Sequence, residues 1–324
     1  MADSKLTALT ELSVVALDDI TYVVDDVAGT PTSVKLSLNR LGGLFLPGLC
    51  GGRLTTESGV PVSTSDRTSQ GTLYLTPFAH NRVALYDGTR WKLYTFAEVS
   101  LSLTLTSGKN YDVFLYDNSG SLTLELSAAW TNDTTRADAL TTQDGVPVKS
   151  GATTRLHVGT IRASGTNVTE DSEGGTTSQV GGKRYVWSRY NQVPRALAVK
   201  DTTDSWTYAS STYRQWNNTA GNKVEYVVGD ASAWVEAHFV AGIYNVTSGN
   251  PGIGVDSTST NSAKVFGEMS GGSIVIPVPA LYRGRPGLGY HYLAPLERAN
   301  SGTATFMGDD TGWEQSGLYA TVWG

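Results

Sequence analysis

The stretch "LSLTLTSGKNYDVFLYDNSGSLTLEL", residues 101–126, decides the fold class of this chain. Leucine occupies every second position in residues 101–105 and again in residues 122–126, with serine, threonine or glutamate between. A period of two places the leucines on one face of a strand and the polar residues on the other. We therefore predict three neighbouring strands in a meander, with one apolar face that must cover another sheet or another subunit.

Strand patterns continue on both sides of this stretch. The sequence "RVALYDGTRWKLYTF", residues 82–96, reads as a hairpin, because Asp87-Gly88 suits a tight turn. Residues 154–164 form a further strand pattern that ends near Ala163, whereas residues 134–142 indicate a short helical excursion. The Gly-, Ser- and acid-rich residues 164–183 indicate a long loop or the lead-in to a second β unit.

Many short strand patterns follow one another in residues 184–324, which predicts a jelly-roll-like sandwich. Glycines in "GNPGIGVDS" (249–257) and "GRPGLGYHY" (284–292) have the wrong spacing for a dinucleotide site and read as turns. At the other end, residues 4–13 have the leucine spacing of a short helix, and residues 18–43 read as a hairpin.

The fold class predicted from these patterns is all-β. A short helix and a hairpin in residues 1–45 form an anchoring segment. Two antiparallel β-sandwich-like domains follow, over residues 46–183 and residues 184–324, the second of them jelly-roll-like.

Composition narrows the classes of function. The 324 residues include 24 Lys and Arg against 30 Asp and Glu, a formal charge of −6, so we expect no nucleic-acid partner. Cys50 is the single cysteine, which excludes an internal disulfide and fits a reducing compartment or a particle assembled in the cytosol. We also expect neither a secretory signal nor a membrane span, since no apolar run has the required length.

Catalytic and metal-binding patterns give no positive signal. The four histidines are never paired at metal-ligand spacing, and His157 and His238 lie inside strand patterns, where a satisfied, partly buried histidine is the expectation. We therefore predict no catalytic residue, no cofactor and no metal ion. The stretch "GDDTGWE", residues 308–314, is the one place where a carbohydrate or calcium contact is considered, and the residues named there as possible receptor contacts are Asp309, Asp310 and Trp313. Acidic residues beside glycine also cap turns, which is the simpler reading of this stretch.

The opening of the chain resembles the N-terminal segments of tailed-bacteriophage fibres and other virion structural proteins. The resemblance is carried by "MADSKLTALTEL" (1–12) and by "DDITYVVDDVAGTPTSVKLSLNRL" (18–41). The block from "GGRLTTESGVPVSTSDRTSQGTLYLTPF" (51–78) to "VGGKRYVWSRYNQVPR" (180–195) is similar to a domain that recurs in phage and prophage structural proteins. The C-terminal part resembles no family, as is usual for the variable end of such proteins.

The resemblance implies a homotrimeric tail fibre or spike, assembled in the host cytoplasm and located in the virion. Its N-terminus would bind other virion proteins of the tail or capsid, and its C-terminal β domain would contact a host-surface glycan. Two alternatives stay open: a head fibre or capsid decoration protein, and a polysaccharide-degrading enzyme of the virion. The sequence leaves the attachment site, the receptor and the copy number undecided.

A set of apolar residues near the N-terminus is expected to be buried only when the segment docks on the particle. Each such side chain contributes about 1.5–3 kcal/mol when fully removed from water, which exceeds the ordering cost of a short hairpin. The residues of this predicted interface are Leu6, Leu9, Leu12, Ile20, Tyr22, Val24, Val34, Leu36 and Leu38.

Overall fold

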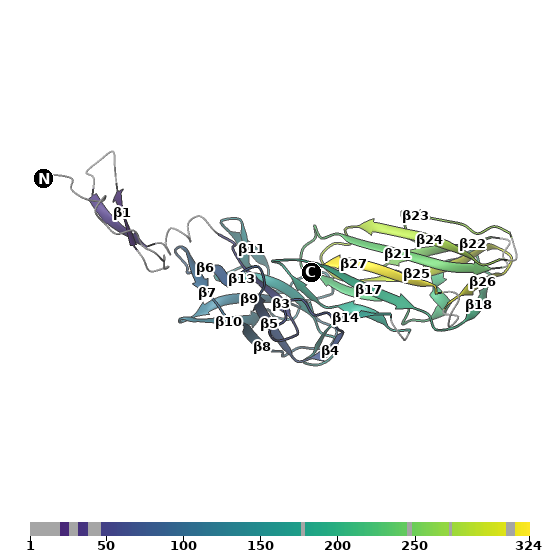
Figure 1. Ribbon diagram of the computed structural model, residues 1–324, viewed down its shortest axis with the longest axis horizontal. Helices are drawn as coiled ribbons and strands as arrows, with labels where there is room; N and C mark the ends of the chain where they lie inside the picture. Colours follow the sequence, from purple (N-terminus) through teal and green to yellow (C-terminus); the bar gives the residue numbers. More distant parts are fainter. Residues whose placement is uncertain are drawn as a thin grey trace.

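The computed structural model shows a protein built almost entirely of β-strands (Figure 1). It describes residues 20–25, 32–37, 47–175, 179–244, 248–271, 274–308 and 315–324. Within these residues the single helical element is a short 3₁₀ turn, Trp216–Asn218. The predicted all-β class is confirmed, and the helix predicted over residues 4–13 lies outside the described residues.

Three sheets built mainly from the first half of the chain share one hydrophobic core. A six-stranded sheet has the order β10 (Ser121–Leu126), β9 (Asn110–Asn118), β13 (Ala152–Arg162), β12 (Val146–Lys149) and β11 (Leu140–Gln143), and β16 (Val186–Ser188) also pairs with β13. A three-stranded sheet has the order β3 (Gly52–Thr55), β5 (Thr72–Pro77) and β8 (Val99–Ser102). The third is the hairpin of β6 (Arg82–Tyr86) and β7 (Trp91–Thr95), which confirms the turn predicted at Asp87-Gly88.

The decisive stretch, residues 101–126, forms strands but not the predicted meander. β9 and β10 pair as a hairpin, whereas β8 pairs with β5 in a different sheet. Residues 103–109 are not a strand. Leu103 and Leu105 are buried in the core that the three sheets share, and they do not continue β8. The apolar face of this stretch is therefore covered by the chain's own sheets, and it needs no second subunit.

Two seven-stranded sheets make up most of the second half. One has the order β19 (Arg214–Gln215), β25 (Gly289–Ser301), β20 (Val224–Val228), β15 (Gly181–Arg184), β14 (Thr169–Gly174) and β4 (Arg67–Gln70), and β22 (Ser248–Val255) also pairs with β25. The other has the order β17 (Pro194–Lys200), β27 (Gly317–Trp323), β21 (Val235–Tyr244), β24 (Ile276–Gly284) and β23 (Val265–Phe266). In this second sheet β26 (Ala304–Met307) pairs with β21 and with β18 (Ser205–Tyr208).

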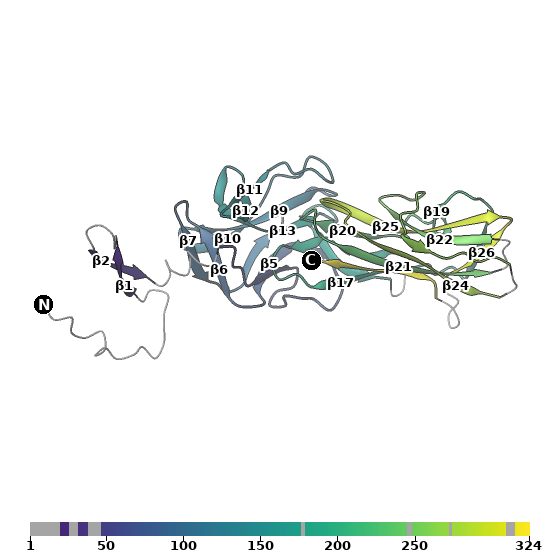
Figure 2. The same cartoon turned by 90° about the horizontal axis from the view of Figure 1, so that it is seen from above.

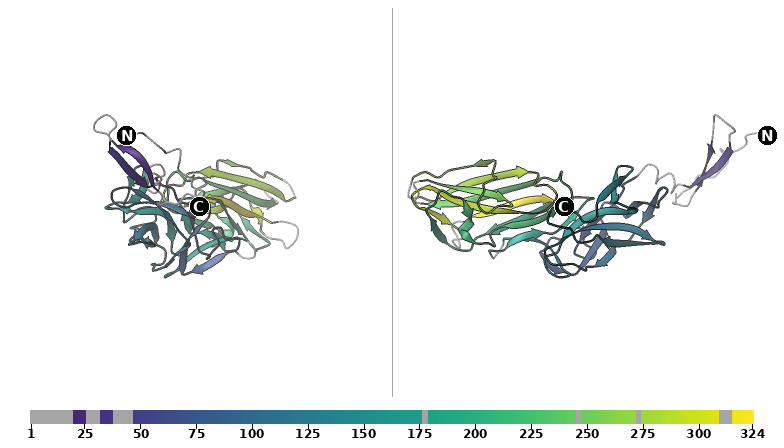
Figure 3. Two further views of the ribbon diagram at one scale, coloured as in Figure 1. Left: turned by 60° about the vertical axis from the view of Figure 1, so that its left-hand side comes forward. Right: turned by 180° about the vertical axis from the view of Figure 1, so that it is seen from behind.

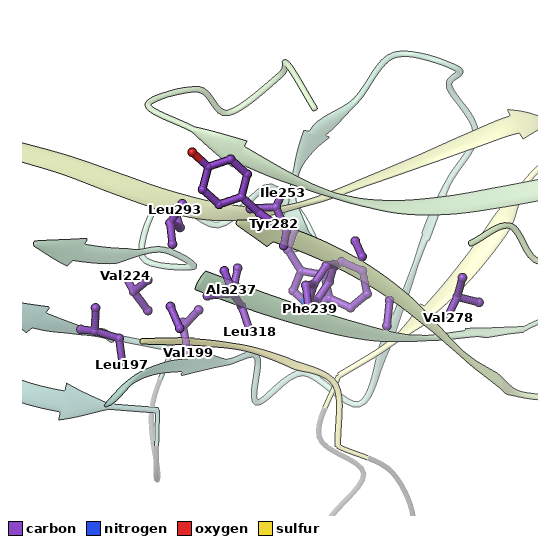
Figure 4. Packing of buried hydrophobic residues seen from close by; sticks show 14 of the residues in the cluster. Leu197, Val199, Val224, Ala237, Phe239, Ile253, Val278, Tyr282, Leu293 and Leu318 are labelled. Atoms are coloured by element: carbon purple, nitrogen blue, oxygen red, sulfur yellow. The ribbon is translucent and has the colours of Figure 1, made fainter. Parts of the chain in front are cut away.

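The two seven-stranded sheets bury one core between them (Figure 4). Val224 and Leu293 come from the first sheet, and Phe239 and Leu318 come from the second. Trp216 lies fully buried among these side chains, with its ring centroid 4.7 Å from that of Phe239 in an edge-to-face arrangement. Aromatic pairs in this geometry add about 0.5–1.5 kcal/mol beyond their buried area.

Sheet pairing runs across the boundary predicted between residues 183 and 184. β14 and β15 form a hairpin over residues 169–184, and β15 continues the sheet by parallel pairing with β20. Residues 164–183 thus contain strands instead of a long loop, which supports the second of the two readings of that segment. Figures 2 and 3 show the two groups of sheets end to end, with the C-terminal residue where they meet.

Two other local predictions are wrong. Residues 249–255 were expected to be a turn but belong to β22. Their glycines are explained by packing, because at Gly252 and Gly254 neighbouring atoms leave no room for a side chain. Residues 134–142 contain no helix; they lead into β11, which pairs with β12.

The hairpin predicted near the N-terminus is confirmed at the level of the backbone. β1 (Ile20–Asp25) pairs antiparallel with β2 (Thr32–Ser37), with Ile20 opposite Ser37. Neither strand pairs with any other described strand. Figure 1 shows this hairpin at one end of the molecule, apart from the sheets.

Candidate ligand-binding face

The sheet β17-β27-β21-β24-β23 has one face in the core and one face turned outward, and we call the second the outer face. Its three central strands alternate over most of their length. On β27, Leu318 and Ala320 are buried, whereas Tyr319 between them is 52% exposed. On β21, Ala237 and Phe239 are fully buried and His238 between them is exposed. The same two-residue period that builds the core therefore also builds the outer face.

One row of outer-face side chains crosses four strands. Tyr319 of β27 lies opposite His238 of β21, and His238 lies opposite Leu281 of β24. Val265 of β23 completes the row opposite Leu281. Because neighbouring strands are about 4.8 Å apart, the row presents a phenol, an imidazole and two aliphatic groups side by side.

The adjacent row is charged. Glu236 lies between Thr321 on β27 and Arg283 on β24, and the Arg283 Nε is 2.9 Å from the Glu236 Oε1. Trp234, which is 41% exposed, precedes β21. The guanidinium carbons of Arg283 and Arg285 lie 5.2 and 4.6 Å from the Trp234 ring centroid, within the range of a cation–π interaction.

Two open grooves lie along the ridge formed by Glu236 and His238. The groove beside β24 has a volume of about 310 Å³, and its lining residues are Glu236, His238, Lys264, Val265, Leu281, Tyr282 and Arg283. The groove beside β27 has a volume of about 360 Å³, and its lining residues are Glu236, His238, Tyr319, Ala320 and Thr321. An exposed ring beside a few hydrogen-bonding groups suits a ligand with apolar C–H faces and many hydroxyls, which is the chemistry of a sugar ring.

A buried charged network elsewhere has the composition of a catalytic site but not its geometry. Asp112 of β9 is fully buried, and its Oδ1 accepts hydrogen bonds from His157 Nε2 at 3.0 Å and Thr160 Oγ1 at 2.8 Å. Its Oδ2 accepts from Trp130 Nε1 at 3.1 Å and Arg136 Nε at 2.7 Å. Burial would raise the pKa of Asp112, but the hydrogen bonds and charges of His157 and Arg136 hold it below its usual value.

His157 has no nitrogen left for a substrate. Its Nδ1 accepts a hydrogen bond from Arg189 Nε at 2.8 Å, so Nε2 carries the proton that it donates to Asp112. Burial lowers the pKa of His157, which favours this neutral form. Arg136 and Arg189 both donate to the Gly229 carbonyl oxygen, so the network ties the six-stranded sheet to the segment after β20. The expectation of a satisfied histidine is confirmed for His157 and wrong for His238, which is exposed on the outer face.

A second buried cluster also ties parts of the chain together. Asp171 Oδ1 accepts from Arg184 and Asp171 Oδ2 accepts from Arg195, both at 2.9 Å. Arg53 lies beside them and donates to the Gly324 carbonyl oxygen at 2.5 Å. Burial, with the charge of Arg195, lowers the pKa of Arg53 to about 10. Both oxygens of Asp171 are thus engaged in joining β14, β15 and β17.

None of the residues predicted from the sequence as anchoring or receptor contacts is among the described residues of the outer face. Asp309, Asp310 and Trp313 lie outside the described residues, as do Leu6, Leu9, Leu12 and Leu38. The backbones of Ile20, Tyr22, Val24, Val34 and Leu36 lie in β1 and β2, and their expected burial stays a prediction. The outer-face residues could have been found from the alternation in "AWVEAHFVAG" (233–242) and "GLYATVWG" (317–324), which separates Glu236, His238 and Tyr319 from the core positions.

The described part of the chain has neither a metal-binding cluster nor a membrane-spanning helix. No three of its His, Cys, Asp and Glu side chains gather where they could hold a metal ion. None of its helices is long and apolar enough to cross a membrane. Neither the models of known protein families nor the curated proteins include a match to this chain.

Proposed function

We propose that this chain is a structural protein of a tailed-bacteriophage virion, a trimeric tail fibre or spike that binds a glycan on the host surface. Residues 1–45 attach it to other virion proteins, and two β-sandwich-like domains follow, the C-terminal one jelly-roll-like. The outer face carries the adhesive function. The observation that supports this most directly is the row of Tyr319, His238, Leu281 and Val265 between two open grooves.

The geometry favours binding over hydrolysis. The one carboxylate that lines the two grooves is Glu236, and it is paired with Arg283. Hydrolysis of a glycosidic bond uses two carboxyl groups in most enzyme families, about 5–5.5 Å or 6.5–9.5 Å apart. A polysaccharide should therefore be bound at the outer face without being cleaved.

The test compares polysaccharide binding by the purified chain with binding by Tyr319→Ala. Tyr319 is exposed and lies on the outer face, so its loss should weaken binding at least about tenfold and leave the unfolding transition unchanged. Tyr74 is a matched control, since it is a partly buried tyrosine on β5 in the other group of sheets. Release of reducing ends from the bound polysaccharide would instead support the enzyme alternative.

A separate measurement tests the place in the virion. Antibodies raised against the purified chain should label the tail tip of particles in electron micrographs. Label on the capsid would favour a head fibre or decoration protein, and particles without label would contradict a virion role.

A further inference from the structure

The charges on the outer face differ in sign from those of the chain as a whole. The chain carries a formal charge of −6. In contrast, Lys264 and Arg283 line the groove beside β24 and Arg285 lies at the end of the same strand, with Glu236 as the one acid lining either groove. Since Glu236 is paired with Arg283, the charges of Lys264 and Arg285 are not neutralised within the grooves.

The basic groups are placed where a bound ligand could reach them. The Arg283 side chain is 68% exposed even though it is paired with Glu236. The guanidinium carbon of Arg285 lies over the Trp234 ring, 4.6 Å from its centroid. A guanidinium fixed on an aromatic ring keeps its edge N–H groups free, and that edge matches a carboxylate in a bidentate geometry.

The basic groups and the exposed ring lie on the same face of the sheet. Arg283 is two strands across and two residues along from Tyr319, so the backbones of the two residues are about 12 Å apart. A ligand that spans them must be an oligomer that has apolar C–H faces on one ring and a negative group on another ring of the same polymer. Neutral polysaccharides supply the first feature without the second.

We propose that the ligand of the outer face is an acidic polysaccharide whose sugar rings carry carboxylates, as in a polyuronate. This rests on the proposed function, because it names the class of glycan bound at the same face. Tyr319 contacts a sugar ring, Arg285 binds a carboxylate through its guanidinium edge, and Lys264 adds a positive charge at the opposite side of the groove. The negative charge of the remaining chain repels such a polymer from other surfaces and directs it to this face.

The test measures binding of the full chain to polygalacturonate, dextran and dextran sulfate at two salt concentrations. We expect polygalacturonate to bind at least about tenfold more tightly than dextran, and this preference to shrink as salt is added. Arg285→Ala and Lys264→Ala should each weaken polygalacturonate binding severalfold. Arg90→Ala is the matched control, because it removes one exposed arginine from the β6–β7 turn and should change nothing.

The possible failures are distinguishable. Equal binding of dextran and polygalacturonate, lost in Tyr319→Ala, would overturn the acidic ligand and leave glycan binding in place. Tighter binding of dextran sulfate than of polygalacturonate would overturn carboxylate recognition, as would an equal loss in Arg90→Ala and Arg285→Ala. A folded chain that binds none of the three polymers would overturn both this inference and the proposed function.

Discussion

Residues 101–126 and the strands β21 and β27 share one sequence pattern and have different surroundings. In both, apolar and polar residues alternate with a period of two. The leucines of the first region are packed in a core against β5, β13 and their neighbours, and the serine, threonine and glutamate side chains between them face outward. In β21 and β27 the inward residues fill a core in the same way, but the outward ones include Tyr319 and Val240, both well exposed. Alternation therefore says which residues share a face, whereas exposed apolar and aromatic groups on the outward face indicate which face binds something.

The largest loss of stability should follow from truncating core-facing side chains in either region. Leu124→Ala and Phe239→Ala remove fully or almost fully buried side chains, so each should lower the free energy of unfolding by about 2–5 kcal/mol. Their outward neighbours on the same strands, Thr123→Ala and His238→Ala, should change it by no more than about 0.5 kcal/mol. Urea denaturation checks all four variants. A His238→Ala loss as large as that of Phe239→Ala would mean that the outer face is covered in the folded protein.

The second expected effect is a change in the free energy of unfolding with pH, and it comes from a carboxyl group in the core beneath the outer face. Glu297 of β25 is fully buried and accepts hydrogen bonds from Trp206 Nε1 and Arg214 Nε, both at 2.7 Å. Burial raises the pKa of Glu297 to about 7, although Trp206 and Arg214 act in the opposite direction. Between its ordinary pKa of 4.5 and about 7 the folded chain holds a proton that the unfolded chain has lost. Glu297 should therefore reduce stability as pH rises through this window, by about 3 kcal/mol in total, and have no further effect above it.

The measurement compares the wild type with Glu297→Gln at pH 4.5, 6 and 8. The wild type should lose stability relative to the variant between the first and last of these values. Glu268→Gln is the control, since Glu268 is exposed and its pKa is lowered by hydrogen bonds from Ser248 and Asn300. A constant difference between wild type and Glu297→Gln would show that the carboxyl group is ionised throughout the window.

Much of the strand content could be predicted from the sequence, because most strands are alternating runs bounded by turn residues. Hairpins such as β6–β7 were found for the same reason. Pairing between strands far apart in the sequence could not be predicted. Nothing local in "VSLS" (99–102) indicates that β8 pairs with β5 instead of β9. β22 was missed because its glycines and Pro251 read as a turn, whereas close packing against β25 and the segment around Ser257 requires small residues there. The outer face was missed because its members are ordinary outward positions until pairing sets Tyr319, His238 and Leu281 in one row.

A smaller loss of stability is expected when a charged side chain is introduced on the outer face. Val240 is exposed on β21 and lies opposite Pro279 of β24. Val240→Lys should cost no more than about 1 kcal/mol, the range of strand propensity, because no buried group is disturbed. The molar mass from light scattering should equal that of the wild type, which is a trimer under the proposed function. A variant that becomes monomeric would show that the outer face joins subunits, and the glycan would then need another surface.

The smallest effect is expected from deleting residues 1–45, since β1 and β2 pair with each other and with no other described strand. We therefore expect the melting transition of the shortened chain to lie within a degree or two of the original, by the usual relation of small free-energy changes to Tm. The shortened chain should still bind polysaccharide through Tyr319 and should no longer join the virion, because three copies of the segment would supply the avidity of attachment. If the deletion lowers the melting temperature by many degrees or prevents expression, the hairpin completes the fold of its own subunit. The anchoring role of Leu6, Leu9, Leu12 and the hairpin residues would then be wrong.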